Sequence, residues 1–413
     1  MNGKLQSIMM TILMMASALS GCAGDDVDLD AEDGGYEYAS NVDNHRMLMG
    51  DVCDIKDLSG EYDWNEVSEI YEDGKHAEKS DGSYRTLQGF ADASGKNHPY
   101  DTYYGADGSL HDFVDAAISG TGPFAGESDT VRDQAVEKGI QNGVMTAYAI
   151  HELNAAISKA EAGNFGTDDA QHAWDEGWAF YHGPDDSDHD YDGCGPYATA
   201  DKRAGNFGTA NSDGTAATNV ATLAAMNDGL TALKAEDLQG AIDARDEVIK
   251  NIVIVYSQAS VRYASKMTDD LAAGDTDDYD KHQAEGHAFY RVIEAYVAEY
   301  TSICYNMQSH AVSADSAQDS CEGYAYYDAA TDNNSMNYTG CYNIVSHQTT
   351  EDNQSTCEAY GWMANYYSNK IVAMFDLAND GDASKDYEAL IRTWLQPAWD
   401  HYGITTADIG TLQ

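Results

Sequence analysis

Apolar residues recur every three or four positions over several long stretches of the chain, which is the spacing of the buried face of an amphipathic helix. The pattern is clearest from Thr130 to Ala162, where we expect Asp129 to cap the helix and Gly163 to end it. The other stretches with this period are 168–182, 218–234, 238–267, 279–305, 358–377 and 384–401. No strong alternation of apolar and polar residues indicates strands. The pattern therefore predicts an all-α fold.

A short internal repeat indicates how these helices are organised. The sequence Glu176–Tyr181 recurs at Glu285–Tyr290 with five of its six positions identical. Each copy follows a long apolar helix, so the chain contains two related helical hairpins, at about 130–182 and 238–305. We expect the two hairpins to pack on each other as one helical bundle.

The N-terminus resembles an export signal. An apolar run from Ile8 to Leu19 is too short to remain in a membrane as a helix, and it leads into Leu-Ser-Gly-Cys ending at Cys22. This arrangement is typical of a bacterial lipoprotein signal, in which Cys22 is lipidated; an ordinary secretory signal is the alternative. We predict a signal peptide at 1–21, a flexible acidic tether at 22–50 and a single helical domain at 51–413, irregular at its start. The protein is then exported and membrane-anchored, in the periplasm or on the cell surface.

The charge balance excludes one class of partner. The 413 residues include 22 Lys and Arg against 71 Asp and Glu, a formal net charge of −49. Nucleic-acid binding needs basic patches, so we expect no nucleic-acid partner. The same acidity is compatible with solubility in a salty medium or with attraction of cations.

Six cysteines remain after Cys22, and an even number in an exported protein indicates disulfides. Sequence does not fix their connectivity. Closure of short loops favours Cys304–Cys321 and Cys341–Cys357, which leaves Cys53 with Cys194. A metal held by thiolates is the competing interpretation, but the chain has no Cys-x-x-Cys pair.

Acids and imidazoles on the repeated helices are the main candidate chemistry. His172 and Glu176 are four residues apart and share a helix face, with Asp175 beside them. In the second repeat His282 and Glu285 are three residues apart, and His287 follows. Carboxylates and imidazoles that project inward from paired helices hold iron or manganese in bundle proteins. The alternative is that these acids brace neighbouring helices through hydrogen bonds.

The duplication suggests where such a metal would bind. Equivalent residues of two packed hairpins come near one axis, so we expect Glu176 and Glu285 to face each other. Two carboxylates placed together repel unless a cation or a proton lies between them. The predicted metal ligands are Glu176, Glu285, His172, Asp175, His282 and His287.

A second candidate is an acidic loop. Asp188, Asp190 and Asp192 alternate before a glycine, as in calcium loops, but the twelfth position is Thr199 rather than glutamate. Calcium is therefore a possible cofactor. The motifs of familiar zinc proteases, serine hydrolases, P-loop proteins and dinucleotide-binding proteins are missing, which disfavours common enzymes.

Several idiosyncratic motifs resemble the low-iron-inducible periplasmic proteins of algae, often called iron-assimilating proteins. The matching segments span about 101 to 305 and are 103–111, 138–181, 197–203, 206–209 and 285–290. The resemblance implies an exported protein that is linked to iron starvation and assists iron uptake by binding iron outside the membrane. It carries over no ligand. The lipoprotein signal departs from the algal pattern and points to a bacterium.

These observations lead to one preferred function and two alternatives. We expect an extracytoplasmic iron-binding protein without catalytic residues, tethered to the membrane only by its lipid, with an iron transporter as a possible partner. The first alternative is a structural or adhesive surface protein stabilised by calcium. The second is an oxidase or hydrolase with a carboxylate-bound metal.

Overall fold

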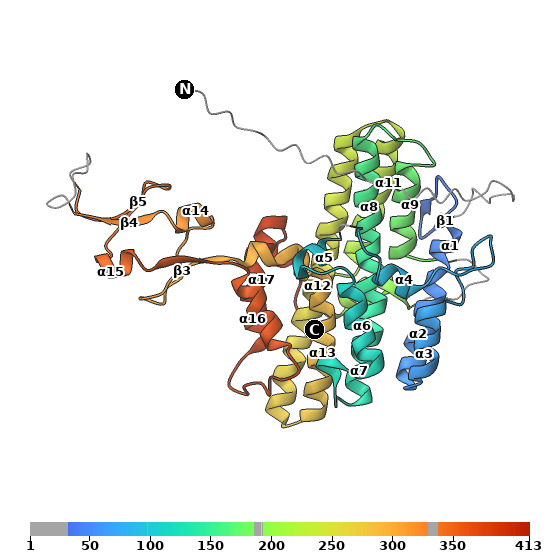
Figure 1. The fold of residues 1–413 in the computed structure, drawn as a ribbon, viewed down its shortest axis with the longest axis horizontal. Helices are drawn as coiled ribbons and strands as arrows, with labels where there is room; N and C mark the ends of the chain where they lie inside the picture. The colour runs from blue at the N-terminus through green and yellow to red at the C-terminus, as the bar shows by residue number, and fades with distance from the viewer. Residues whose placement is uncertain (1–31, 97, 186–190, 192, 329–337) are drawn as a thin grey trace.

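The computed structural model describes residues 32–413 apart from 97, 186–190, 192 and 329–337. Figure 1 shows a helical body from which a narrow arm, residues 303–363, projects to one side. Within the described part of the chain, no helix is long and apolar enough to cross a membrane. The predominance of helix confirms the predicted all-α class.

Two helical hairpins form the centre of the body. The first joins α7 (Asp129–Lys138), the π-helical segment η2 (Gly139–Val144) and α8 (Met145–Glu161) to α9 (Ala170–Tyr181). The second consists of α12 (Leu238–Ala273) and α13 (Thr276–Val297). Helix α8 packs on α12 and α7 packs on α13, so the hairpins pack on each other as predicted.

The start of the first hairpin differs from the prediction in its cap. Ser128, not Asp129, is the N-cap, and its hydroxyl accepts a hydrogen bond from the backbone N–H of Val131. The Asp129 carboxylate instead accepts hydrogen bonds from Arg132 and Trp64. Serine and aspartate both favour the N-cap position. The contacts of Asp129 with Arg132 and Trp64 leave that position to Ser128.

Further helices cover the hairpins. They are α10 (Gly195–Phe207), α11 (Ala217–Lys234), α16 (Tyr366–Met374), α17 (Tyr387–Tyr402) and α18 (Thr406–Ile409). Helix α10 lies between the predicted helices 168–182 and 218–234, outside every stretch that has a helical period. Its buried face consists mainly of small side chains such as Ala200 and Ala204, which give a weak apolar signal.

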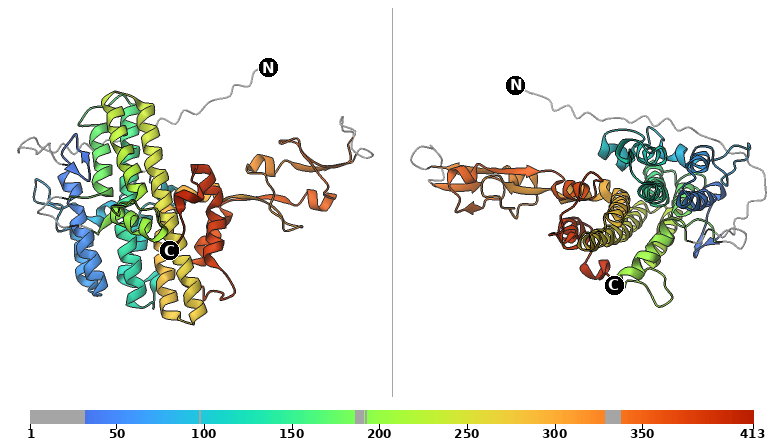
Figure 2. Two further views of the ribbon diagram at one scale, coloured as in Figure 1. Left: turned by 180° about the vertical axis from the view of Figure 1, so that it is seen from behind. Right: turned by 90° about the horizontal axis from the view of Figure 1, so that it is seen from below.

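The N-terminal elements form a layer against the first hairpin and run from blue to teal in Figures 1 and 2. They are β1 (Glu32–Asp33), β2 (Tyr36–Glu37), α1 (Asp43–Arg46), α2 (Leu48–Gly60), α3 (Trp64–Asp73), α4 (Leu87–Ala91), α5 (Pro99–Tyr104), α6 (Ser109–Ser119) and the 3-10 turn η1 (Gly122–Phe124). Residues 32–50 were predicted to belong to a flexible tether, and this was wrong. Tyr36 and Tyr38 are buried and donate hydrogen bonds to Asp175 and Asp33, respectively. Buried tyrosines and paired acids fold this polar stretch onto the body.

The arm is built from short strands that begin soon after α13 and the 3-10 turn η3 (Ala298–Thr301). β3 (Ile303–Asn306) pairs antiparallel with β7 (Tyr360–Met363), and β4 (Tyr324–Tyr327), β5 (Gly340–Asn343) and β6 (Thr349–Thr350) form a second sheet. The short helices α14 (Gln318–Cys321) and α15 (Gln354–Cys357) lie between them. Strands of four residues or fewer are too short to give a periodic signal, which explains why no strands were predicted here and why the helix predicted at 358–377 begins only at Tyr366.

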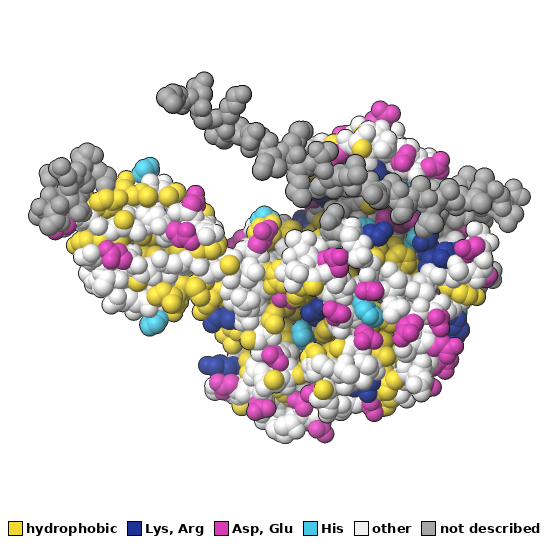
Figure 3. Space-filling view, viewed as in Figure 1, with side chains coloured by type: hydrophobic (Ala, Val, Ile, Leu, Met, Phe, Trp, Pro, Cys, Tyr) yellow, Lys and Arg dark blue, Asp and Glu magenta, His cyan; other side chains and the backbone are white. Residues whose placement is uncertain are grey.

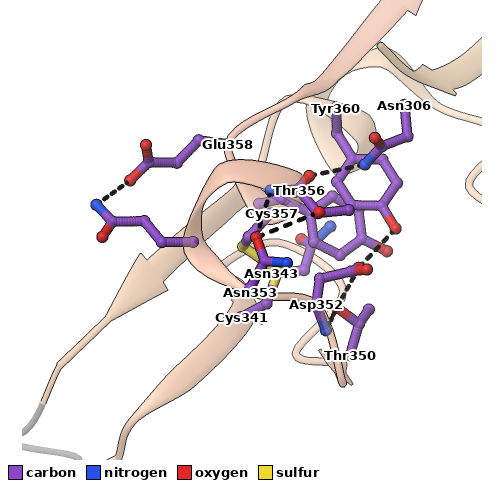
Figure 4. The surroundings of a disulfide bond; sticks show 12 residues. Asn306, Cys341, Asn343, Thr350, Asp352, Asn353, Thr356, Cys357, Glu358 and Tyr360 are labelled. Atoms are coloured by element: carbon purple, nitrogen blue, oxygen red, sulfur yellow. Dashed lines mark hydrogen bonds between the residues drawn. A yellow bond between two sulfur atoms is a disulfide. The ribbon is translucent and has the colours of Figure 1, made fainter. Parts of the chain in front are cut away.

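All three predicted disulfides are present. Cys53–Cys194 joins α2 to the residue before α10, while Cys304–Cys321 and Cys341–Cys357 lie within the arm. Figure 4 shows the surroundings of Cys341–Cys357, where Asn353 caps α15 and Tyr360 donates a hydrogen bond to Asp352.

The arm contains a second internal repeat. Cys-Tyr-Asn at 304–306 recurs at 341–343, and each asparagine side chain donates a hydrogen bond to the other half, Asn306 to Thr356 and Asn343 to Ser320. The rings of Tyr324 and Tyr360 stack with centroids 4.2 Å apart. Residues 303–363 contain no Lys or Arg, and Met307 and Ile344, each directly after one copy of Cys-Tyr-Asn, are exposed. Figure 3 shows that hydrophobic side chains gather on the arm.

Candidate metal centre

Glu176, on the inner face of α9, lies in close contact with two imidazoles. Its Oε1 lies 3.1 Å from Nδ1 of His45 and 3.1 Å from Nε2 of His172. His172 is one helical turn earlier on α9, as the spacing predicted, and His45 comes from α1. The Glu176 side chain is only 12% exposed, so these contacts lie largely out of water.

Glu152 on α8 completes the group, because its side chain is hydrogen-bonded to that of Glu176. Burial raises the pKa of Glu152 well above its ordinary value, and the charge of Glu176 raises it further. Burial also opposes ionisation of Glu176, but His45 and His172 outweigh it and lower the pKa to about 2. The pair therefore holds one proton, on Glu152, and one negative charge, on Glu176.

The two imidazoles differ in their surroundings. Burial lowers the pKa of His45 to about 4, and the nearby Glu176 offsets only part of this effect. The hydrogen bond to Glu176 raises the pKa of the more exposed His172. His45 is thus neutral at pH 7 and keeps a nitrogen lone pair, which is the form of histidine that binds metals.

Asp175 does not belong to this group of side chains; it holds the neighbouring segment, residues 36–40, in position. Its carboxylate accepts hydrogen bonds from the Tyr36 hydroxyl, the backbone N–H groups of Ala39 and Ser40, and the Ser40 hydroxyl. Ser40 Oγ in turn lies 2.9 Å from Nδ1 of His172. Asp175 was predicted to be a metal ligand, but both its oxygens are occupied in fastening residues 36–40 to α9, just ahead of His45.

Two further histidines lie beside Glu152. Nε2 of His151 is 3.9 Å from Oε1 of Glu152, and the ring of His98 lies 4.6 Å from that of His151, centroid to centroid. His98 is 2% exposed, and neither of its ring nitrogens has a hydrogen-bond partner. Burial lowers the pKa of both, that of His151 to about 3, so both imidazoles are neutral at pH 7.

The second repeat places its corresponding residues differently. Glu285 is hydrogen-bonded to Tyr263, which also contacts Arg203. Nδ1 of His282 lies 2.6 Å from Asp270, and its other nitrogen lies 3.2 Å from Lys266.

His287 packs against the ring of Phe113, and burial lowers its pKa to about 3. In the described part of the chain, no hydrogen bond or ion pair joins Glu285, His282 or His287 to Glu176. The expected meeting of Glu176 with Glu285 thus has no contact to support it.

Sequence reasoning therefore found His172 and Glu176 but missed His45 and Glu152. His45 fell in the predicted tether, and only the fold of that segment brings it near Glu176. Glu152 follows His151 on α8, and this His-Glu pair was the available signal. The calcium candidates Asp188, Asp190 and Asp192 and the lipidation candidate Cys22 lie outside the described residues.

The acids and imidazoles hold one another through hydrogen bonds and short contacts. Among the residues that the structure describes, no three His, Cys, Asp or Glu side chains are arranged as a ready metal site. A cation would have to replace the proton of Glu152 and draw the side chains around itself. Metal binding here would be coupled to proton release.

The chain matches the family model described as low iron-inducible periplasmic protein over residues 8–315. It belongs to this family. The match confirms the resemblance seen in the sequence. It covers both hairpins and the acid–imidazole group, which consists of His45, Glu152, His172 and Glu176. Most of the arm lies beyond it. No curated protein and no solved structure matches the chain. As a low iron-inducible periplasmic protein, the chain is an extracytoplasmic protein linked to iron uptake.

Proposed function

We propose that this protein binds iron outside the cytoplasm and assists its uptake, with His45, Glu152, His172 and Glu176 as the ligands. The observation that carries the proposal is the largely buried Glu152–Glu176 pair, flanked by two imidazoles, in a member of a low-iron-induced family. Carboxylate oxygens and imidazole nitrogens are donors that iron accepts in proteins. Iron is the cargo of this site.

The electrostatics of the pair favour a cation. Two carboxyl groups in contact ionise together only when a positive charge lies between them. Without a metal ion, one proton lies between the two carboxyl groups instead. A bound iron ion would allow both Glu152 and Glu176 to be ionised, and neutral His45 needs to lose no proton to become a ligand.

The donor types also separate iron from calcium. Calcium prefers an all-oxygen environment, whereas half of the proposed ligands are nitrogen. A calcium-stabilised surface protein is therefore the weaker candidate for this group. We further propose that Cys22 carries a lipid anchor, that the bound iron passes to a transporter, and that the protein binds its metal without turning it over.

The proposal is tested by metal analysis of matched variants. The mature protein is loaded with ferrous iron under anaerobic conditions, or with ferric citrate in air, then desalted and assayed for iron. Glu176→Gln removes the central charge and keeps the shape, and the equivalent residue of the other repeat provides the control, Glu285→Gln. Circular dichroism checks that both variants fold.

We expect the wild type and Glu285→Gln to retain iron and Glu176→Gln to lose it. Iron retained with unchanged affinity by a folded Glu176→Gln protein would show that the group only braces the bundle. Steady oxidation of excess ferrous iron would instead assign an enzyme.

A further inference from the structure

A second pair of imidazoles, His98 and His151, extends the group that binds iron in our proposal. His151 lies next to Glu152 both in sequence and in space, with its Nε2 3.9 Å from the carboxylate. His98 packs against His151 and against Tyr148, whose ring centroid is 4.9 Å away. Six metal-ligating side chains are thus linked in series, from His45 and His172 through the two glutamates to His151 and His98.

His98 provides an independent sign that a ligand belongs here. A buried polar group without a partner costs about 1–3 kcal/mol, so such groups are rare in native structures. His98 leaves both ring nitrogens unpartnered at 2% exposure. Its backbone is held at the start of α5, where Pro99 follows in the first turn. An imidazole nitrogen that carries no proton offers a lone pair to a metal ion.

We propose that the centre takes two divalent first-row metal ions, with the carboxylates of Glu152 and Glu176 between them. One ion takes His45 and His172, and the other takes His98 and His151. The inference rests on the proposed function and adds a second ion to it. Two-metal centres in helical bundles are likewise built from carboxylates and histidines that project inward from neighbouring helices.

The two ions would not bind equally. Two ionised carboxylates carry two negative charges, which one divalent ion already balances. Arg85 and Lys96 add positive potential at this group. The second ion therefore binds more weakly than the first, at the side of the pair nearer His98 and His151.

The experiment is an anaerobic titration with Co²⁺ and with Fe²⁺, followed by the d–d absorption of cobalt and by bound metal per chain. The wild type is compared with His98→Asn and His151→Asn, and with His287→Asn, a histidine of the other repeat, as the control. His151 is partly exposed, so its variant is the one less prone to misfold.

We expect two ions per wild-type chain in two steps. His98→Asn and His151→Asn should retain the first ion and weaken the second by about tenfold or more, while His287→Asn keeps both. One ion in the wild type, unchanged in the His98 and His151 variants, overturns the second ion and leaves the proposed function standing. Two ions in all variants overturns the ligand assignment, and no ion in the wild type overturns the proposed function itself.

Discussion

Glu152 on α8 and Glu176 on α9 lie with their side chains hydrogen-bonded to each other in a largely buried part of the first hairpin. The contact is stable only with a proton or a cation between the two carboxyl groups. The surroundings decide where the proton lies, because the imidazoles contact Glu176 and leave Glu152 protonated. If the proposed iron site is correct, this relationship makes iron binding depend on pH.

Iron affinity should rise with pH across the neutral range. The pKa of Glu152 is raised well above its ordinary value, so this residue must release its proton when a cation binds. Calorimetry in buffers of different ionisation heats should detect about one proton released per first iron. A binding enthalpy that does not depend on the buffer would contradict proton displacement. Glu152→Gln should abolish both the proton release and most of the affinity.

Folding stability should fall as pH drops from about 6.5 towards 4. The pKa of His45 is depressed by burial from 6.5 to about 4, so the unfolded chain binds this proton before the folded chain does. His151 and His287, whose pKa values are lowered to about 3, should also make the folded protein less stable as pH falls.

The contribution of His45 is fully present above pH 6.5 and is lost as pH falls through its folded pKa. Urea unfolding of the metal-free protein at pH 7 and pH 4.5 measures the difference, and His45→Gln should reduce it. An equal difference in the wild type and in His45→Gln would show that His45 does not contribute to it.

Loss of the Asp175 carboxylate should loosen the N-terminal layer and weaken iron binding without removing a proposed ligand. Asp175→Asn keeps the size of the side chain but removes the charge that accepts hydrogen bonds from Tyr36, Ala39 and Ser40. Hydrogen bonds to a charged group contribute about 1.5–3 kcal/mol each.

Hydrogen exchange should therefore speed up in residues 32–46, and iron affinity should fall because His45 loses its fixed position. Asp270→Asn, which removes the partner of His282 in the second repeat, is the control and should leave exchange in residues 32–46 unchanged. Unchanged protection of residues 32–46 in Asp175→Asn would mean that other contacts hold this layer.

Removal of the disulfide Cys341–Cys357 should unfold the arm and leave the proposed metal site unchanged. The strands of the arm have four residues or fewer and bury too little apolar surface to be stable alone. The two disulfides, Cys304–Cys321 and Cys341–Cys357, stabilise them. Cys341→Ser with Cys357→Ser should make the arm sensitive to protease. The helical signal and bound iron should stay as in the wild type. A loss of iron in this double variant would show that the arm takes part in binding.

The sequence by itself was enough for features that depend on near neighbours along the chain. The long helices follow from apolar residues at steps of three and four, and the contact of His172 with Glu176 follows from one helical turn. The pairs Cys304–Cys321 and Cys341–Cys357 were also accessible, because short loops close readily, and they left Cys53 and Cys194 as the remaining pair.

Only the tertiary structure brought His45 and Glu152 to Glu176. His45 is held there by a polar segment whose order comes from Asp175, a partner more than a hundred residues away along the chain. Glu152 meets Glu176 because α8 and α9 pack face to face, and the equivalent Glu285 meets Tyr263 instead. Duplication preserved the positions of the two glutamates on their helices but not the side chains that face them. The facing side chain decides whether a buried acid shares a proton with another acid or receives a hydrogen bond from a tyrosine.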